Sequence, residues 1–151
     1  MKLTAGLPTV AIESPFAGRW WWNRWANVRY ARQCLLDCIE RGEAPLASHL
    51  LYTQVLDDSI PAHRLLGINA GLSWNLHADY IAVYVDRGIS GGMRAGVKFA
   101  IGCGIPVQLR SLYAHGHLDV AKVGWSRALA LAEAGELAWT IQNGERHPYA
   151  G

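Results

Sequence analysis

The sequence is poor in the features that identify several large classes of proteins. Only three of its 151 residues are cysteine, Cys34, Cys38 and Cys103, and they form no CxxC pair. This odd number, set in apolar segments, predicts buried reduced thiols in a cytoplasmic protein rather than a disulfide framework. The six histidines are scattered without the spacing of a metal site, so we expect no metal.

An excess of one charge is lacking too. The formal net charge of +2 gives no reason to expect nucleic acid or an anionic membrane as a partner. No apolar run approaches a membrane span, and residues 1–10 lack the apolar core of a signal peptide. Neither GxGxxG nor GK[ST] occurs, so the chain offers no familiar nucleotide-cofactor motif, and we expect no cofactor.

What the sequence does contain is centred on Asp79 to Leu109. An apolar run, Tyr80–Val85, is typical of a strand buried on both faces, and Asp86 closes it. A glycine-rich turn and a helical segment from Met93 to about Cys103 follow, and a further strand begins near Ile105. This order predicts a parallel α/β unit, in which ligands bind outside the carboxyl ends of the strands.

The turn after Asp86 therefore lies at the mouth of the expected site. Its candidate ligand-binding residues are Gly88, Ser90, Gly91, Gly92 and Met93. Backbone N–H groups at the start of the helix would face an anion or a ribose hydroxyl. The alternative is that these glycines only permit a tight connection between strand and helix.

The segment at Thr9–Glu13 predicts a first strand that ends in an acid. Pro15 cannot donate a ladder hydrogen bond, so the strand must stop near Ser14. Glu13 would then share the sheet edge with Asp86. Its carboxyl group would either contact a ligand, in binding or proton transfer, or make a structural hydrogen bond to nearby backbone.

The remaining segments are assigned from periodicity and turn residues. Ser48 and His49 fall inside an expected second strand and near the same edge, where His49 is either a ligand contact or a satisfied buried histidine. The expected elements are a helix from an Asn27 cap to about Arg41, a strand over Ala44–Leu51, a helix over Ala62–Trp74, a helix over Leu118–Ala134, and a strand or helix end over Leu137–Ile141.

The segment Arg19–Trp25, RWWWNRW, is unusual because four tryptophans and two arginines in seven residues cannot all be core. Tryptophan and arginine are enriched in protein interfaces and also stack on purine bases. The segment is therefore either an interface or a lid beside the site.

The ordered motifs SPF, ASHLL, ADYIAVYVD, GMRAG and GIPV resemble the nucleoside 2-deoxyribosyltransferase-like superfamily. They look most like an uncharacterised branch of small bacterial and phage proteins. The resemblance implies a single flavodoxin-like domain, doubly wound, with a mostly parallel sheet of four or five strands in the order 2-1-3-4. The tryptophan segment 19–25 would be an insertion, and residues 114–151 a helical extension.

The resemblance also assigns residues to the site. It places Ser14, Pro15 and Phe16 in the loop around the base and sugar, and Asp79 and Asp86 at two nucleoside-contacting aspartates. The nucleophilic glutamate of that superfamily follows a Gly-Met pair, but Arg94 follows Gly92-Met93 here. A guanidinium cannot attack an anomeric carbon, although it can hold a phosphate.

Two classes of function follow. The first is a nucleotide-binding protein without standard deoxyribosyl transfer, in which Arg94 holds the phosphate of a nucleotide or nucleotide-derived ligand. The second is an enzyme that cleaves an N-glycosidic bond with Glu13 and Asp86 as catalytic residues. A scaffold with a vestigial pocket is a third alternative. The surplus of tryptophan predicts a homo-oligomer, at least a dimer.

Overall fold

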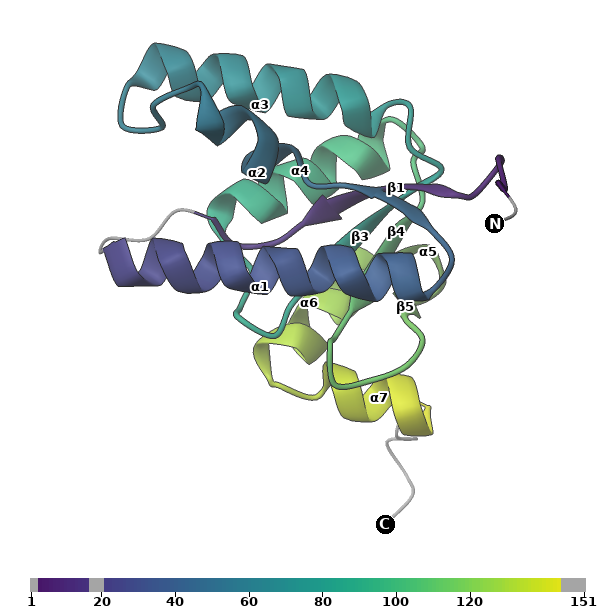
Figure 1. Cartoon of the computed structure of the whole chain (residues 1–151). Coiled ribbons are helices and arrows are strands. Elements are labelled where there is room, and N and C mark those ends of the chain that lie inside the picture. Colours follow the sequence, from purple (N-terminus) through teal and green to yellow (C-terminus); the bar gives the residue numbers. More distant parts are fainter. Residues whose placement is uncertain (1–2, 17–20, 145–151) are drawn as a thin grey trace.

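The computed structural model describes residues 3–16 and 21–144. A five-stranded sheet forms its centre, in the order β2-β1-β3-β4-β5 (Figure 1). The first four strands are parallel, and β5 runs antiparallel to β4. The strands are β1 (Thr9–Glu13), β2 (Ala44–Leu46), β3 (Tyr80–Tyr84), β4 (Val107–Arg110) and β5 (Leu118–Asp119). The predicted doubly wound α/β fold is confirmed, including the 2-1-3-4 order.

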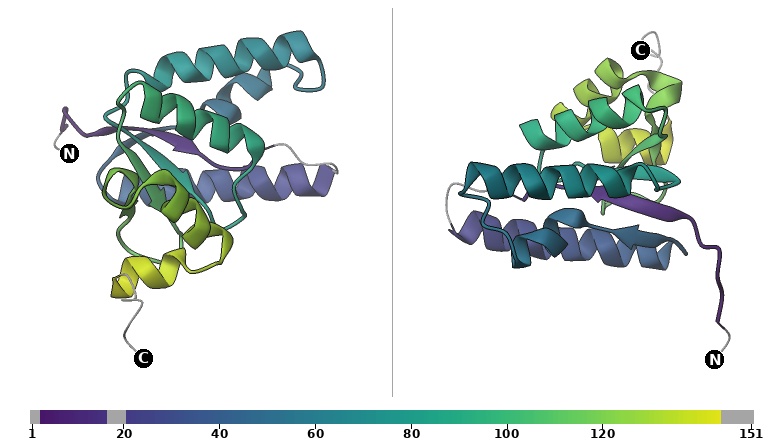
Figure 2. Two further views of the ribbon diagram at one scale, coloured as in Figure 1. Left: turned by 180° about the vertical axis from the view of Figure 1, so that it is seen from behind. Right: turned by 90° about the horizontal axis from the view of Figure 1, so that it is seen from above.

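Helices cover both faces of this sheet, as Figure 2 shows from two further directions. They are α1 (Trp21–Glu40), α2 (Ser48–Leu51), the 3₁₀ turn η1 (Tyr52–Gln54), α3 (Pro61–Asn75), α4 (Gly91–Gly102), α5 (Val120–Val123), α6 (Trp125–Glu133) and α7 (Leu137–Asn143). Among the helices described, none has the length and apolar character that crossing a bilayer requires.

Alternate residues of the buried strands point to opposite faces, and each face has its own core. Ala82 and Tyr84 of β3 pack with Cys34 and Cys38 of α1. The intervening Ile81 and Val83 pack with Met93, Val97 and Ala100 of α4. A strand that is buried on both sides needs apolar residues at every position, which explains the unbroken run from Tyr80 to Val85.

Three elements differ from the sequence-based prediction. The strand expected over Ala44–Leu51 ends at Leu46, because β1 pairs with it only through Thr9, Val10 and Ala11. Ser48 and His49 therefore lie on α2. The first helix begins at Trp21, so Asn27 is inside it rather than at its cap, and the Asn27 amide instead donates to the carbonyl oxygen of Phe16 at 3.3 Å.

The helix expected over Leu118–Ala134 is divided into β5, α5 and α6. Leu118–Asp119 pairs with β4, the Asp119 side chain caps α5, and Gly124 adopts a φ of 82° between the two helices. The segment over Leu137–Ile141, for which strand and helix were both open, belongs to α7. Local apolar periodicity cannot reveal a break that depends on pairing with a distant strand.

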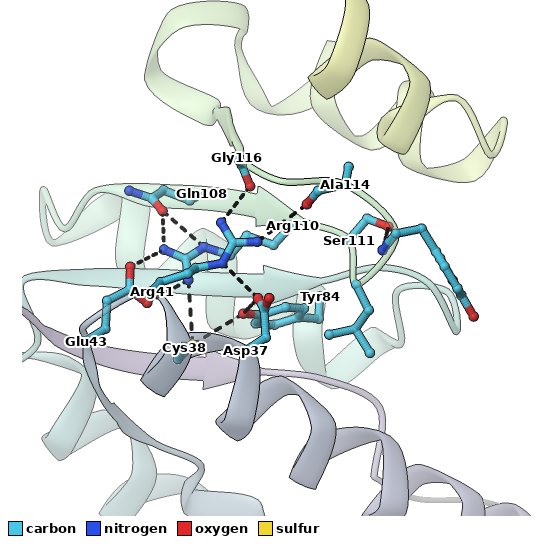
Figure 3. A network of polar contacts seen from close by, with 12 residues as sticks. Asp37, Cys38, Arg41, Glu43, Tyr84, Gln108, Arg110, Ser111, Ala114 and Gly116 are labelled. Carbon is cyan, nitrogen blue, oxygen red and sulfur yellow. Dashed lines mark hydrogen bonds and ion pairs between the residues drawn. The ribbon is translucent and has the colours of Figure 1, made fainter.

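A buried polar network holds α1, β3 and β4 together on the α1 face (Figure 3). Arg110 donates two hydrogen bonds to the Glu43 carboxylate, one to each oxygen, both over 2.7 Å. Burial alone would raise the pKa of Glu43, but hydrogen bonds from Arg110 and Tyr80 hold that pKa below its usual value. Nearby, Tyr84 donates to Asp37, and Arg41 donates to the carbonyl oxygen of Gly116. These bonds connect α1 and the segments next to it with β3 and β4.

Candidate functional site

The carboxyl ends of β1 and β3 are flanked by two separate cavities. The first, which we call the Glu13 cavity, has a volume of about 460 Å³ and lies among the end of β1, α2, α3 and the start of α4. Its walls mix apolar groups from Phe16, Leu56, Ile68 and Leu72 with polar side chains. This size and mixed lining are typical of a small-molecule site.

Glu13 is the acid of this cavity. Its carboxyl group is deeply buried, and burial raises its pKa from 4.5 to about 7, although a hydrogen bond from Asn75 opposes the rise. The Asn75 amide donates to Glu13 Oε1 over 3.3 Å. A carboxyl group with a pKa near neutrality can both give and take a proton at physiological pH.

Gly96 of α4 makes room for this carboxyl group. A Cβ atom built at residue 96 would lie 2.8 Å from Glu13 Oε1 and 3.1 Å from its Cδ. Any larger residue at position 96 would therefore displace the Glu13 carboxyl group from its present position. The consequence is that the carboxyl group beside the first turns of α4 comes from β1 and not from α4 itself.

Ser14 and His49 form a second polar pair in the same cavity. Ser14 Oγ lies 2.8 Å from His49 Nε2, within hydrogen-bonding distance. Burial lowers the pKa of His49 from 6.5 to about 4, so its ring is neutral at physiological pH. The Phe16 ring contacts the imidazole edge-on, with ring centroids 5.9 Å apart. A neutral imidazole paired with a hydroxyl can offer both a donor and an acceptor to a ligand.

The glycine turn leads into the opposite wall of the cavity. Ser90 caps α4, and its Oγ accepts a hydrogen bond from the Met93 N–H over 3.2 Å. Ser90, Gly91, Gly92 and Met93 all line the cavity. The first N–H groups of a helix have no partner within it, so this end of α4 is suited to a negatively charged or oxygen-rich ligand.

Arg94 does not line the Glu13 cavity, contrary to the role expected for it. Its guanidinium forms an ion pair with Glu133 of α6. The residues of α4 that reach the cavity beyond Met93 are Ala95 and Gly96. Arg94 lies on another side of the helix from Gly96, because two residues along an α-helix correspond to about 200° of rotation.

Asp86 and Gly88 line the second cavity, which has a volume of about 550 Å³ and is closed on its far side by residues of α6 and α7. The Asp86 carboxylate accepts hydrogen bonds from Tyr30 at 2.7 Å, from the Leu112 N–H at 2.9 Å, and from Ser111. These bonds tie the end of β3 to α1 and to the chain after β4. The structure therefore does not bring Asp86 and Glu13 together in one cavity.

Two other expected ligand contacts lie outside both cavities. Asp79 precedes β3 and is at the amino edge of the sheet, where its carboxylate accepts from the Thr9 N–H at 2.7 Å. An aspartate at that edge is a strand length away from Ser14 and cannot share its ligand. Pro15 is buried beside Ser14 and does not line the Glu13 cavity.

Several cavity residues were missed by sequence reasoning, and most of them come from α2 and α3. Ser48, Tyr52, Arg64 and Asn75 all line the Glu13 cavity. Gly71 allows α3 to reach α2, since a Cβ there would lie 2.6 Å from Ser48 Oγ. The three-and-four spacing of the lining residues between Arg64 and Asn75 predicts that they share one face of a helix. It does not predict that this face points toward the cavity.

The tryptophan segment lies only partly within the described residues, because 17–20 fall outside them. Trp22 and Trp25 are on the first turns of α1, with 48% and 60% of their surface exposed. Arg24 packs over the Phe16 ring at 5.0 Å, so this end of α1 reaches the wall of the Glu13 cavity. Whether the segment is an interface or a lid stays a prediction.

Among the described residues, no cluster of three or more His, Cys, Asp or Glu side chains could hold a metal ion. One protein-family model matches residues 8–110, and its description is "Domain of unknown function (DUF7768)". The matched range contains the whole Glu13 cavity, whereas much of the Asp86 cavity is built from residues beyond it. No curated protein matches the chain.

Proposed function

The chain belongs to the DUF7768 family, and from that premise we propose that its Glu13 cavity binds a nucleotide or a nucleotide-derived small molecule. The observation that carries this proposal is the convergence of three kinds of group on one cavity. Apolar and aromatic walls, two hydrogen-bonded polar pairs and the first turn of α4 all face the same space. These groups match the three parts of a nucleotide, namely base, sugar and phosphate.

Each part of a nucleotide has its own set of partners in the cavity. Phe16 and Tyr52, with the aliphatic side chains beside them, suit the flat face of a base. Glu13 with Asn75, and Ser14 with His49, suit sugar hydroxyl groups. The N-terminus of α4 suits phosphate. The resemblance to the nucleoside 2-deoxyribosyltransferase-like superfamily supports the same assignment to this sheet edge.

Standard deoxyribosyl transfer is not part of the proposal. The residue after Gly92-Met93 is Arg94, and its side chain pairs with Glu133 outside the cavity. Helix α4 therefore supplies no carboxylate nucleophile to the ligand. We also place the protein in the cytoplasm, because Cys34, Cys38 and Cys103 are all free thiols.

A second candidate function is hydrolysis of an N-glycosidic bond with Glu13 as the acid. The raised pKa of Glu13, at about 7, favours it, because such a group could protonate a departing base. Asp86 takes no part in this version, since it opens onto the other cavity.

Calorimetry with nucleosides and nucleotides, followed by chromatography of the same mixtures, tests both candidates. Binding with every ligand recovered intact supports the binding protein. Release of free base by the wild type, and its loss in Glu13→Gln, supports the hydrolase. Rapid exchange of bases between deoxynucleosides would contradict the exclusion of transfer, and no binding of any nucleoside or nucleotide would overturn both candidates.

A further inference from the structure

One face of α3 lines the Glu13 cavity along almost its whole length. Its lining residues follow the three-and-four spacing that places side chains on one side of a helix: Arg64, Gly67, Ile68, Gly71, Leu72 and Asn75. At 1.5 Å per residue, the backbone positions of Arg64 and Asn75 lie about 16 Å apart. Asn75 contacts Glu13 at one end of this face, and Arg64 stands at the other.

Arg64 is exposed to solvent, lines the cavity and has no carboxylate partner among the described residues. It is the only lysine or arginine among the described residues that line the cavity, and none of its side-chain atoms forms an ion pair or hydrogen bond with the described chain. Two acids, Glu13 and Asp58, line the same cavity. Arg94, in contrast, is already paired with Glu133.

The starts of α3 and α4 lie at the same edge of the sheet. Both helices run back toward the amino ends of the strands that follow them, so both begin at the carboxyl edge, and they lie side by side in Figures 1 and 2. Gly91 and Gly92 in the first turn of α4 line the cavity together with Arg64. The cavity therefore has a guanidinium on its α3 side and the first N–H groups of α4 on another side.

We propose that Arg64 binds the phosphate of a nucleoside 5′-monophosphate and so makes the cavity prefer the phosphorylated ligand over the free nucleoside. The inference rests on the proposed function of the Glu13 cavity and goes beyond it by naming the ligand class and the residue that selects it. A guanidinium fits a phosphate through two parallel N–H···O bonds, whereas it adds little to a neutral nucleoside.

The test is calorimetry with the four 2′-deoxynucleosides and their 5′-monophosphates, on wild type, Arg64→Ala, Arg64→Lys and Arg94→Ala. The wild type should bind at least one monophosphate more tightly than its nucleoside. Arg64→Ala should weaken that monophosphate roughly 10- to 100-fold and leave the nucleoside within about twofold. Arg64→Lys should fall between them, and Arg94→Ala should match the wild type.

The possible failures are distinguishable. If Arg64→Ala weakens nucleoside and monophosphate equally, or weakens neither, the role of Arg64 is overturned while the proposed function stands. If the wild type binds none of the eight ligands, the proposed function itself fails. Thermal unfolding of each variant identifies loss of fold, and Arg64→Gln, which keeps much of the side chain, replaces Arg64→Ala if that variant does not fold.

Discussion

At the residue scale, Glu13 has the property that most distinguishes the cavity. Below pH 4.5 its carboxyl group is protonated in both the folded and the unfolded chain. Between pH 4.5 and about 7 the unfolded chain releases this proton while the folded chain retains it. Ionisation therefore favours the unfolded state, and the contribution of Glu13 to folding stability falls as the pH rises, by about 3 kcal/mol in all.

Glu13→Gln removes this titration while keeping the shape of the side chain. Relative to the wild type, the variant should gain roughly 2–3 kcal/mol of unfolding free energy at pH 8 and almost none at pH 4. Urea denaturation at a series of pH values measures the difference. Ser14→Ala, which retains Glu13, is the control. Its free energy of unfolding should fall with rising pH as steeply as that of the wild type. A gain that is equal at pH 4 and pH 8 would contradict the raised pKa.

At the scale of elements, the contact between β1 and α4 depends on the pairing of Glu13 with Gly96. Gly96→Ala would place a Cβ 2.8 Å from a Glu13 oxygen, so we expect a loss of about 1–3 kcal/mol of stability. In a Glu13→Ala background the clash is gone, and the same change should stabilise by up to about 1 kcal/mol because alanine favours helix.

If Gly96→Ala destabilises with Glu13 present and stabilises without it, its cost comes from the contact with Glu13. A general intolerance of α4 to substitution would give the same cost in both backgrounds. Gly102→Ala is the matched control, because a Cβ at that end of α4 meets no atom within 4 Å. It should stabilise by at most about 1 kcal/mol, and by the same amount in either background. Chemical denaturation of the four variants in the cycle gives the coupling, and a Gly96→Ala cost that persists without Glu13 would exclude the proposed contact.

At the scale of the whole molecule, α3 and Leu76 directly after it leave large apolar side chains uncovered. Leu65 and Leu66 each expose 59% of their surface, and Trp74 and Leu76 each expose 52%. Large exposed apolar side chains are common at interfaces between chains, so the homo-oligomer expected from the sequence remains our prediction.

Sedimentation velocity at micromolar concentration should therefore show a species heavier than one chain. Changing both Leu65 and Leu66 to serine should shift the population toward the single chain. Ile101→Ser, which alters an exposed apolar residue on α4, is the control and should leave association unchanged. A wild type that sediments only as one chain would disprove this prediction.

The sequence by itself determined where β1, β3 and the glycine turn lie, and with them part of the list of cavity residues. Apolar runs such as Tyr80–Val85 and the glycine-rich turn after Asp86 are local signals, because burial and backbone freedom act within a few residues. Glu13, Ser14 and the turn from Ser90 to Met93 were predicted at the carboxyl edge for this reason, and they line one cavity.

Only the tertiary structure decided which of the candidates share a ligand. Arg94 and Arg64 are both helical arginines in the sequence, yet one pairs with α6 and the other faces the cavity. Asp86 and Glu13 both end strands, yet they open onto different cavities. The physical reason is that a helix fixes the spacing of its side chains, whereas its rotation and its neighbours are set by packing between segments far apart in the chain.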